Sequence, residues 1–510
     1  MRFSLPARRF TRRATAFSAA VLLALSVTLV ASARVDLIRI SSDPYTNPTS
    51  QHRTEVEPDT FAFGNTIVSA FQVGRFFNGG ASNIGWATST NGGRTWSHGF
   101  LPATTVFATP PGSYDRTSDP SVAYDAKRGV WLISYLAIHD IGGAPGVVDV
   151  LVSRSTDGGR TWDQPVAVRK ATGTEDLDKN WTVCDDTPSS PFYGHCYTEW
   201  DDFGNINRVQ MSTSTDGGKT WGAPKTTPDH ACVIGGQPLV QPNGTVIVPI
   251  DDCFETAVLA FRSTDGGQSW SRAVLAAQIT SSLVSGNLRT GPLPSAEMDQ
   301  SGRVYVVWQD CRFEPPNCAF NDIVMTTSDD GIHWSLVKRV PIDPIGRGVD
   351  HFIPGLAVDP STSGRGAHLG LAYYYYPNGN CGTFTTAPCQ LNVGFVSSTN
   401  GGASWSDAEQ LAGPMLLEWL PATTQGRMVG DYISTSIVPA NDATPVFAVA
   451  RQPSGAPDCF AVGAVCHEDM YTAPEDLLRL VGGTNTAGNE PVFEPSLSAQ
   501  SRQTTRSTAR

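Results

Sequence analysis

Carboxylates and basic side chains that could carry out acid–base or nucleophilic chemistry recur along this chain. A carboxylate can serve as general acid, general base or nucleophile, and arginine can hold a carboxylate through two parallel hydrogen bonds. The alternative is that such residues cap turns or join neighbouring units, above all in dipeptides such as Asp119-Pro120 and Gly430-Asp431. The catalytic candidates are Glu57, Asp119, Asp178, Asp431 and Tyr432, and the substrate-binding candidates are Lys179, Arg289, Arg312, Asp350, His351 and Arg427.

Six near-copies of one eight-residue segment form the framework that must position these candidates. The shared pattern is Ser/Thr-x-Asp/Asn-x-Gly-x-x-Trp, and the six tryptophans lie 66, 59, 49, 64 and 71 residues apart. The Asp or Asn side chain closes a tight turn, the Gly adopts a positive φ, and the Trp covers apolar surface beside the turn. The copies are STNGGRTW (89–96), STDGGRTW (155–162), STDGGKTW (214–221), STDGGQSW (263–270), TSDDGIHW (327–334) and STNGGASW (398–405).

Self-similarity at this period indicates a solenoid or a propeller with one β-rich unit per repeat. Sets of three β-rich runs precede the boxes, and a seventh set at 431–438, 445–451 and 468–473 follows the last box. We therefore predict an all-β propeller of four-stranded blades, with seven blades favoured and six as the alternative. The N-terminal run VDLIRISS (35–42) would supply the missing outer strand of the seventh set and remove an open sheet edge.

The boxes also indicate which face to search for a site. They are expected to be turns between the third and fourth strands, so a ligand is expected at the opposite end of the central channel, where the longer loops lie. Residues expected near the start of an innermost strand are Glu57, Asp119, Asp178, Lys179, Gln237, His351 and Asp431. Residues expected in flanking loops are Arg53, Arg75, Arg116, Glu199, Asp201, Asp202, Asp251, Asp252, Arg289, Asp310, Arg312, Asp350 and Arg427.

The six segments resemble the Asp-box (BNR) repeats of the sialidase superfamily, and this resemblance spans roughly residues 50–475. It implies a secreted β-propeller and an exo-acting glycosidase of the sialidase type. The family's Arg-Ile-Pro motif has no counterpart here, since the nearest string, Arg339-Val340-Pro341, follows the fifth box. The family's arginine triad could be rebuilt from Arg289, Arg312 and Arg427, and its nucleophile from Glu199 with Tyr197 or Tyr432.

Two other functions remain open on the sequence. A polysaccharide lyase acting on acidic glycans would use the same arginines with a histidine or tyrosine base, and His139 and His351 are the histidine candidates. A glycan-binding or protein-binding propeller would need no acid and base at all. Sialidase action would release free sialic acid, lyase action would give an unsaturated product that absorbs ultraviolet light, and a binding protein would do neither.

Export is expected from the N-terminus. Residues 1–33 read as a signal peptide, with five arginines, an apolar stretch over 19–30 and a small-residue cleavage site at Ala31-Ser32-Ala33. Residues 34–480 form the expected propeller, and 481–510 an expected disordered tail. Removing five arginines changes the formal charge from −12 to −17, which argues against nucleic acid or an anionic membrane as partner. We expect a secreted monomer that acts on a glycan or glycoconjugate.

The ten cysteines fall in five close pairs, each within one repeat, which favours five disulfides in an exported protein. Three pairs are expected in loops between second and third strands, and the pair nearest the N-terminus is expected to join a hairpin. No cofactor is expected, and a catalytic metal is not assigned. A structural Ca²⁺ bound by Asp201-Asp202 or Asp251-Asp252 is an open alternative. The pairs are Cys184/Cys196, Cys232/Cys253, Cys311/Cys318, Cys381/Cys389 and Cys459/Cys466.

Overall fold

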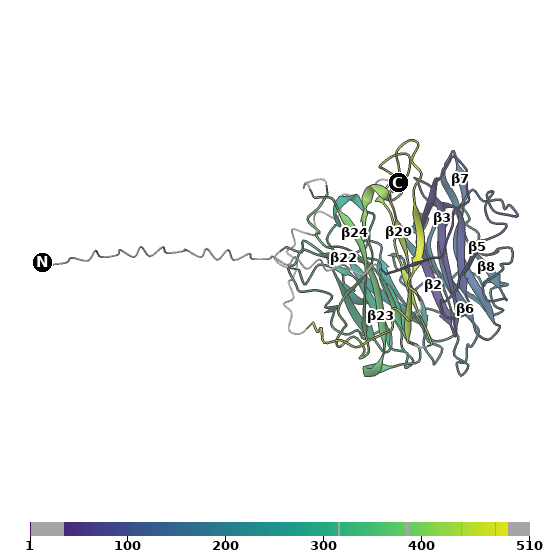
Figure 1. Cartoon of the computed structure of the whole chain (residues 1–510). Coiled ribbons are helices and arrows are strands. Elements are labelled where there is room, and N and C mark those ends of the chain that lie inside the picture. The colour runs from purple at the N-terminus through teal and green to yellow at the C-terminus, as the bar shows by residue number, and fades with distance from the viewer. Residues whose placement is uncertain (2–34, 315–316, 383–386, 440, 475, 488–510) are drawn as a thin grey trace. The chain divides into compact units, whose positions relative to one another are not determined.

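The computed structural model describes residues 1, 35–314, 317–382, 387–439, 441–474 and 476–487. Apart from Met1, the expected signal peptide lies outside this range. Val35–Arg510 is one compact unit and is described here by itself. Its described part is built of antiparallel strands in a β-propeller arrangement (Figure 1). None of the helices in the described ranges has the length and hydropathy needed to span a membrane.

The N-terminal half contains three sheets. The first holds β2 (Gln51–Phe63), β3 (Thr66–Arg75), β4 (Ala81–Ser89), β5 (Ser97–Phe100), β6 (Arg116–Asp125), β7 (Val130–Ile141), β8 (Ala144–Ser155) and β9 (Val166–Arg169). The second holds β10 (Leu177–Cys184), β11 (Cys196–Asp202) and β12 (Arg208–Ser214), and a 3-10 helix, η1 (Phe203–Asn205), follows β11. The third holds β13 (Val233–Ile234), β14 (Leu239–Val240), β15 (Val246–Asp252), β16 (Ala257–Ser263) and β17 (Val274–Gln278).

The C-terminal half follows the same plan. One sheet holds β18 (Ser295–Met298), β19 (Val304–Asp310), β20 (Asp322–Ser328) and β21 (Lys338–Arg339), and the next holds β22 (Asp350–Val358), β23 (Leu369–Tyr376), β24 (Gln390–Ser398) and β25 (Glu409–Leu416). The last large sheet has the order β1 (Ile38–Arg39), β30 (Glu468–Thr472), β29 (Asp442–Ala450), β28 (Ser434–Val438). Between them lie η2 (Ser285–Asn287), η3 (Gly364–Gly366), η4 (Leu417–Trp419) and the small pair β26 (Ala422–Thr423) and β27 (Gly426–Arg427).

The blade count does not follow from strand pairing alone. Among the described residues, five sheets have four or more strands, so the expected count of seven is not confirmed. The eight-stranded sheet is joined in its middle, between β4 and β6, by the single pair Ala81↔Thr117. Each half of that sheet is a four-stranded antiparallel meander in its own right.

Side chains of one innermost strand bind the backbone of the next innermost strand. The Asp59 carboxylate accepts from Val122 N at 2.7 Å, and Ser121 Oγ accepts from Thr182 N at 3.0 Å. Ser295 Oγ accepts from Leu356 N at 3.0 Å in the same manner. Apolar side chains fill the space between neighbouring sheets; Leu132 and Val150, for example, pack in one cluster with Trp200 of β11. These contacts place consecutive sheets side by side around a common axis.

The N-terminal run 35–42 closes the last sheet, as predicted. Strand β1 pairs with β30 through Ile38↔Thr472 and Arg39↔Tyr471, and Ile40 N donates to Met470 O at 3.0 Å. Ser41 then accepts from Met470 N at 2.8 Å and donates to the Glu55 carboxyl. The hydroxyl of Ser41 therefore connects the start of the chain to β2 and to β30.

We predict that Ser41→Ala lowers the free energy of unfolding by about 1 kcal/mol, because it removes the hydroxyl's hydrogen bonds to Met470 N and to the Glu55 carboxyl, which then keep only their direct hydrogen bond of 3.1 Å. The measurement is denaturant unfolding followed by tryptophan fluorescence. Ser361→Ala is the matched control, since that hydroxyl lies in an exposed turn. Equal midpoints for the two variants would show that the closing segment contributes nothing through Ser41.

The Asp boxes form the turns that the sequence predicted. In the second box, between β8 and β9, Asp157 accepts from Thr161 N at 3.0 Å and from Thr161 Oγ1 at 2.7 Å. Gly158 and Gly159 have φ values of 81° and 77°, and Trp162 Nε1 donates to Gly159 O at 3.1 Å. The turn is thus closed by contacts within eight residues, which is why six copies form the same turn.

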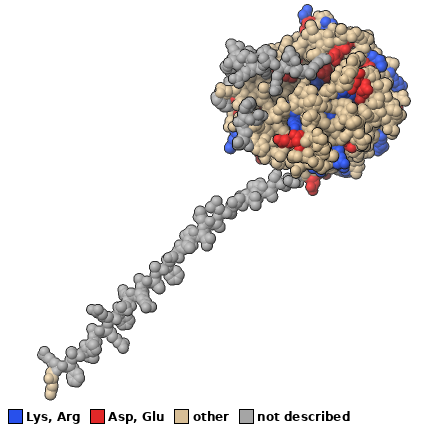
Figure 2. All heavy atoms as spheres, turned by 90° about the horizontal axis from the view of Figure 1, so that it is seen from above, with Lys and Arg blue, Asp and Glu red and all other residues tan. Residues whose placement is uncertain are grey.

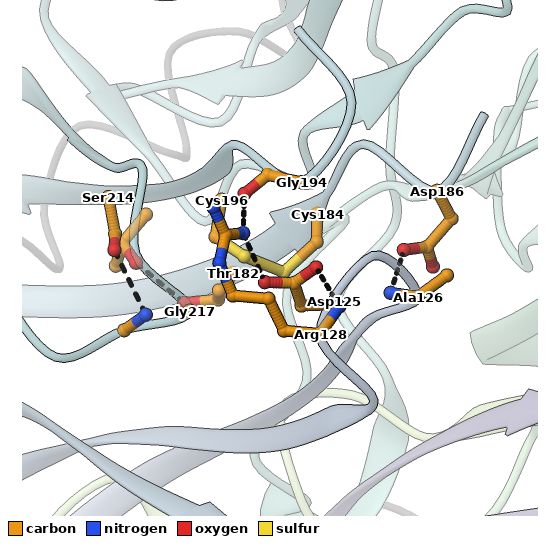
Figure 3. Close-up of a disulfide and its surroundings, with 12 residues drawn as sticks. Asp125, Ala126, Arg128, Thr182, Cys184, Asp186, Gly194, Cys196, Ser214 and Gly217 are labelled. Atoms are coloured by element: carbon orange, nitrogen blue, oxygen red, sulfur yellow. Dashed lines mark hydrogen bonds and ion pairs between the residues drawn. A yellow bond between two sulfur atoms is a disulfide. The ribbon is translucent and has the colours of Figure 1, made fainter. Parts of the chain in front are cut away.

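All ten cysteines form the five predicted disulfides. Cys184–Cys196 joins the β10–β11 hairpin, and next to it Arg128 donates to Asp125 at 2.7 Å and to Gly194 O at 2.6 Å (Figure 3). The bridges 311–318, 381–389 and 459–466 lie in loops between the second and third strands of their sheets. Five disulfides are typical of proteins in oxidising compartments.

The start of the expected tail differs from the prediction. Residues 481–485 contact the sixth Asp box, where Trp405 N donates to Asn485 O at 2.8 Å and Ser404 Oγ donates to Gly483 O at 2.6 Å. These residues supply an additional edge contact to the box, a role that their polar composition does not reveal. Residues 488–510 lie outside the described range.

Candidate functional site

Three charged residues occupy a left-handed backbone conformation in three innermost strands. Glu57 in β2, Asp119 in β6 and Lys179 in β10 have φ values of 56°, 48° and 52°. Each lies where the register with the neighbouring strand shifts, so each is a β-bulge. Residues other than glycine adopt this conformation at an energetic cost, and such strain gathers at functional sites. The bulges turn the three side chains toward one another.

Lys179 is the centre of the resulting cluster. Its Nζ donates to the Asp431 carboxylate and lies 3.7 Å from Asp119 Oδ2 and 3.9 Å from Glu57 Oε1. Arg289 also binds Asp431 with two nitrogens, and its Nε lies 2.6 Å from Oδ1. The side chains of Lys179, Glu57, Asp119 and Asp431 are each less than a tenth exposed. We call Glu57, Asp119, Lys179, Arg289 and Asp431 the channel cluster.

Neutral hydrogen bonds hold the carboxyl groups of the cluster in place. Glu57 accepts from the side chain of Gln72 and from Asp431 N at 3.2 Å, and Gln72 in turn accepts from Arg75 Nη1 at 3.1 Å. Asp119 accepts from Ser118 Oγ at 2.8 Å. Hydrogen bonds from neutral donors thus fix the carboxyl groups of Glu57 and Asp119 on either side of Lys179.

Burial and neighbouring charges give these acids different pKa values. Burial, together with Asp119 and Asp431, raises the pKa of Glu57 well above its usual value. Burial also acts to raise the pKa of Asp431, but Arg289 and Lys179 outweigh it and hold that pKa far below normal. The pKa of Asp119 is lowered too, because Lys179 overcomes the effect of burial. Of these acids, Glu57 therefore holds a proton most strongly, and Asp119 and Asp431 are ionised.

Asp178 lies beside the cluster and is only partly buried. Burial and the charge of Asp119 raise the pKa of Asp178 to about 6. Its Oδ1 accepts from Lys179 N at 3.0 Å. Asp178 can thus exchange a proton near neutral pH. Asp119, which stays ionised, cannot.

A small pocket opens beside the cluster. Tyr432 lies in its wall and donates to Pro120 O at 3.0 Å, so its hydroxyl is held by backbone and its pKa is raised by burial. Trp181 meets the Tyr432 ring edge-on at 5.2 Å. Aromatic walls beside carboxylates suit a sugar ring, which presents C–H groups on its faces and hydroxyls on its rim. The lining residues are Asp119, Lys179, Asn180, Trp181, Gly235, Gln237, Leu293, Pro294 and Tyr432.

The structure does not bring the three arginines of the expected triad together. Arg289 binds Asp431 in the cluster, whereas Arg312 binds Asp310 with Nε at 2.9 Å and Nη2 at 2.7 Å. Arg427 directs its side chain to Asp458 at 2.6 Å, and only its backbone carbonyl meets Arg289, whose N donates to it at 2.7 Å. Each arginine is thus paired with a different nearby acid, so its charge is balanced without a triad.

Asp350 and His351 lie in β22, apart from the cluster. Asp350 accepts from Asn321 N and Nδ2, both at 2.9 Å, and burial raises its pKa to about 7. His351 is buried against Tyr373 and Tyr375, and burial lowers its pKa to about 3. A histidine so enclosed is a poor base for the lyase alternative. The four tyrosines at 373–376 pack mainly into the core, as expected.

Asp322, Asp343 and His351 are the one group of potential metal ligands found close together among the described residues. Arg339 already lies between the two acids, 2.8 Å from Asp322 Oδ1 and 2.9 Å from Asp343 Oδ1. The guanidinium therefore supplies the positive charge that a metal would bring. In the loops considered for Ca²⁺, Asp202 accepts from Asp176 N and Asp252 accepts from Thr256 N, so both acids cap turns.

Sequence reasoning missed Gln72 and Trp181. Gln72 lies in the second strand of its sheet and reaches Glu57 only through strand pairing, which leaves no local signal. Trp181 follows the candidate Lys179 by two residues, and this spacing is the sequence signal that could have indicated Trp181.

Comparison with known proteins agrees with this architecture. Residues 136–350 match the family model described as BNR repeat-like domain. A sialidase of Bacteroides fragilis (strain YCH46) is 28% identical over 165 residues, a stretch that covers 27% of this chain and 28% of the relative. The chain contains BNR repeats in a β-propeller arrangement. The matched stretch of this BNR-repeat propeller thus covers little more than a quarter of the length of that relative.

Solved structures similar to this BNR-repeat propeller include sialidases. Hadza microbial sialidase Hz136 has a TM-score of 0.45 and 15% identity, covering 84% of this chain and 67% of that one. A leech intramolecular trans-sialidase, in complex with 2,7-anhydro-Neu5Ac, has a TM-score of 0.41 and 14% identity, covering 87% and 71%. A protein of unknown function from Dyadobacter fermentans DSM 18053 has a TM-score of 0.46 and 15% identity, covering 71% and 99%.

Proposed function

We propose that this protein is a secreted, sialidase-like glycoside hydrolase that acts on glycans at the channel cluster, on the face opposite the Asp boxes. The observation that carries the proposal is a set of carboxyl groups with separated proton affinities around Lys179, beside a pocket with an aromatic wall. Glycoside hydrolysis needs such a set, because one acid must give a proton to the leaving group while another stays ionised.

We propose different roles for the acids. Asp178, which precedes Lys179 in β10 and has a pKa of about 6, is the proposed proton donor to the leaving oxygen. Asp119 lines the pocket in its ionised form and stabilises positive charge that develops on the sugar. Lys179 and Asp431 position Asp119 rather than react. Asp431 accepts from two of the three nitrogens of Arg289, Nε and Nη2, so an anionic sugar would have to share that arginine with Asp431.

We also infer that the propeller has seven blades. The eight-stranded sheet divides into two four-stranded units at the single pair Ala81↔Thr117, and each of the other large sheets, together with β10–β12, is one further unit. The hydrogen bonds between innermost strands support the same division, since they join Asp59 to Val122 and Ser121 to Thr182 across units.

Hydrolysis of fluorogenic glycosides tests the function. We expect the wild type to cleave a sialoside or another aryl glycoside in a panel, with kcat/KM falling above about pH 6 as Asp178 loses its proton. Asp178→Asn and Asp119→Asn should each lower kcat about 100-fold or more, the usual size of a lost acid or base. The matched control is Asp163→Asn at an exposed position, which should leave the rate unchanged.

Two results would count against this assignment. If no glycoside in the panel is cleaved, the protein is not a hydrolase of these sugars, and a glycan-binding role takes precedence. If the wild type cleaves but both cluster variants match Asp163→Asn, the reaction takes place elsewhere on the propeller.

A further inference from the structure

The turn between β15 and β16 presents an aromatic ring and a carboxyl group side by side. Phe254 is 75% exposed, and the next residue, Glu255, is exposed as well and has a left-handed φ of 55°. Glu255 N donates to Asp252 O at 2.9 Å, and Asp252 accepts from Thr256 N at 2.6 Å, so the base of the turn is closed. The Glu255 carboxyl has no hydrogen-bond partner among the described residues.

A disulfide ties this turn to the wall of the pocket beside the channel cluster. Cys253 is bonded to Cys232, and Cys253 N donates to Cys232 O at 3.2 Å. The residue after Cys232 pairs with the turn itself, as Val233↔Asp252. Two residues further along the chain, Gly235 lines the pocket. A covalent bond and strand pairing therefore hold the turn at a fixed place relative to that wall.

The Glu255 carboxyl meets a second part of the same wall. A methyl group added at Gly291 would lie 3.0 Å from Glu255 Oε1, so the carboxyl packs beside Gly291. Gly291 lies halfway along the segment from Arg289 of the channel cluster to Leu293 of the pocket wall. Burial of the carboxyl and the charge of Asp431 raise the pKa of Glu255, and the two cations of the cluster act to lower it. Glu255 is thus within electrostatic reach of the channel cluster.

We propose that Phe254 and Glu255 bind a neutral sugar residue on the leaving-group side of the bond that is cleaved. The ring of Phe254 stacks on the face of that sugar, and the Glu255 carboxyl accepts from its hydroxyls. This subsite rests on the proposed function for the reacting sugar, but its binding can be measured without catalysis. The cluster is buried and the turn is exposed, so a glycan whose terminal sugar lies at the cluster must extend outward along the wall that carries the turn.

The chemistry of the turn fits a sugar better than an isolated exposed side chain would. A sugar ring presents C–H groups on its faces and hydroxyls on its rim, so an aromatic ring next to a carboxylate meets both. Single exposed apolar residues are common, but here the disulfide and the closed turn fix the backbone of Phe254. Fixing the backbone in advance reduces the entropy lost on binding.

The charge of the surroundings indicates that this sugar is neutral. The formal charge of the chain is −12, and acidic residues form the larger coloured patches on the face seen in Figure 2. A sugar carboxylate at the turn would meet the Glu255 carboxyl and, beyond it, the charge of Asp431. Sugar hydroxyls, in contrast, donate hydrogen bonds to a carboxylate.

Isothermal titration calorimetry with lactose, cellobiose and maltose tests the subsite directly. We expect the full chain to bind at least one of these neutral disaccharides, Phe254→Ala to weaken that binding about tenfold, and Glu255→Gln about fivefold. The matched control is Phe63→Ala, which should bind like the wild type. Phe63 is 45% exposed and lies where β2 turns into β3, at the end of the strands where the Asp boxes lie.

Hydrolysis of matched substrates links the subsite to the reaction. For the sugar that the wild type cleaves, kcat/KM should be higher when the leaving group is a second neutral sugar than when it is methanol, and Phe254→Ala should remove most of that preference. The subsite is refuted if no disaccharide binds, if Phe254→Ala and Glu255→Gln bind as the wild type does, or if Phe63→Ala weakens binding equally. Disaccharide binding that depends on Phe254, without any hydrolysis, would refute the hydrolase alone.

Discussion

Replacing Lys179 with methionine is expected to lower the free energy of unfolding by about 3–5 kcal/mol, the cost of leaving buried charges without their partner. Lys179 is the cation that lies within 4 Å of Asp119, Glu57 and Asp431 at once. Without Lys179, Asp119 and Asp431 would have only Arg289 as a common counter-charge. Otherwise they would have to bind protons at a pH at which carboxyl groups are normally ionised. Denaturant unfolding at pH 7 measures the loss.

The matched control for this substitution is Lys219→Met in the third Asp box. Lys219 is exposed, so its replacement should change stability by no more than about 0.5 kcal/mol. The loss caused by Lys179→Met should also shrink as the pH is lowered, because protonated carboxyls need no counter-charge. A loss no larger than that of Lys219→Met would show that the cluster is held by packing rather than by charge.

Stability is expected to fall as the pH rises from 5 to 8. Burial raises the pKa of Asp59 and of Asp350 to about 7, and it raises the pKa of Glu199, Asp251 and Glu468 well above the usual range. The folded protein therefore binds more protons than the unfolded chain between pH 4 and pH 7, and stability decreases with pH over that interval. Asp119 and Asp431 have lowered pKa values and act in the opposite sense, below about pH 4.

The expected size of this effect is several kcal/mol. A carboxyl whose pKa rises from 3.8 to about 7 on folding, as for Asp59, changes stability by up to about 4 kcal/mol. Guanidinium unfolding at pH 5, 6, 7 and 8 measures the slope. Asp59→Asn should be less stable at pH 5, since an amide cannot accept from both Thr60 N and Val122 N, yet its slope should be smaller. A stability that rises toward pH 8 would contradict the assignment of these acids as protonated.

The sequence predicted the strands and turns well because their determinants are local. Each Asp box closes through bonds within eight residues, as between Asp157 and Thr161, so a repeated pattern gives a repeated turn. The disulfides were predictable for the same reason, since each pair lies in one repeat. The number of blades was less accessible, because β4 and β6 share a pair that joins two units into one sheet.

The candidate site was predictable only in part. Glu57, Asp119, Lys179 and Asp431 were expected near the starts of innermost strands, and such positions converge in any propeller. The partners of Arg312 and Arg427 were not predictable, because the partner of a long flexible side chain depends on which acid lies nearest. Arg312 finds Asp310 two residues away, whereas Arg427 finds Asp458 in a loop 31 residues later.

The closing strand also constrains the order in which the molecule can be made. Ser41 and Met470, which meet at the closure, are 429 residues apart, so the ribosome releases one long before the other. Until the last sheet is synthesised, β1 has no partner and the ring cannot be sealed. A contact of such sequence separation is slow to form. Closure must therefore wait until β30 has been synthesised, and an incomplete chain that lacks β30 cannot form the closed ring.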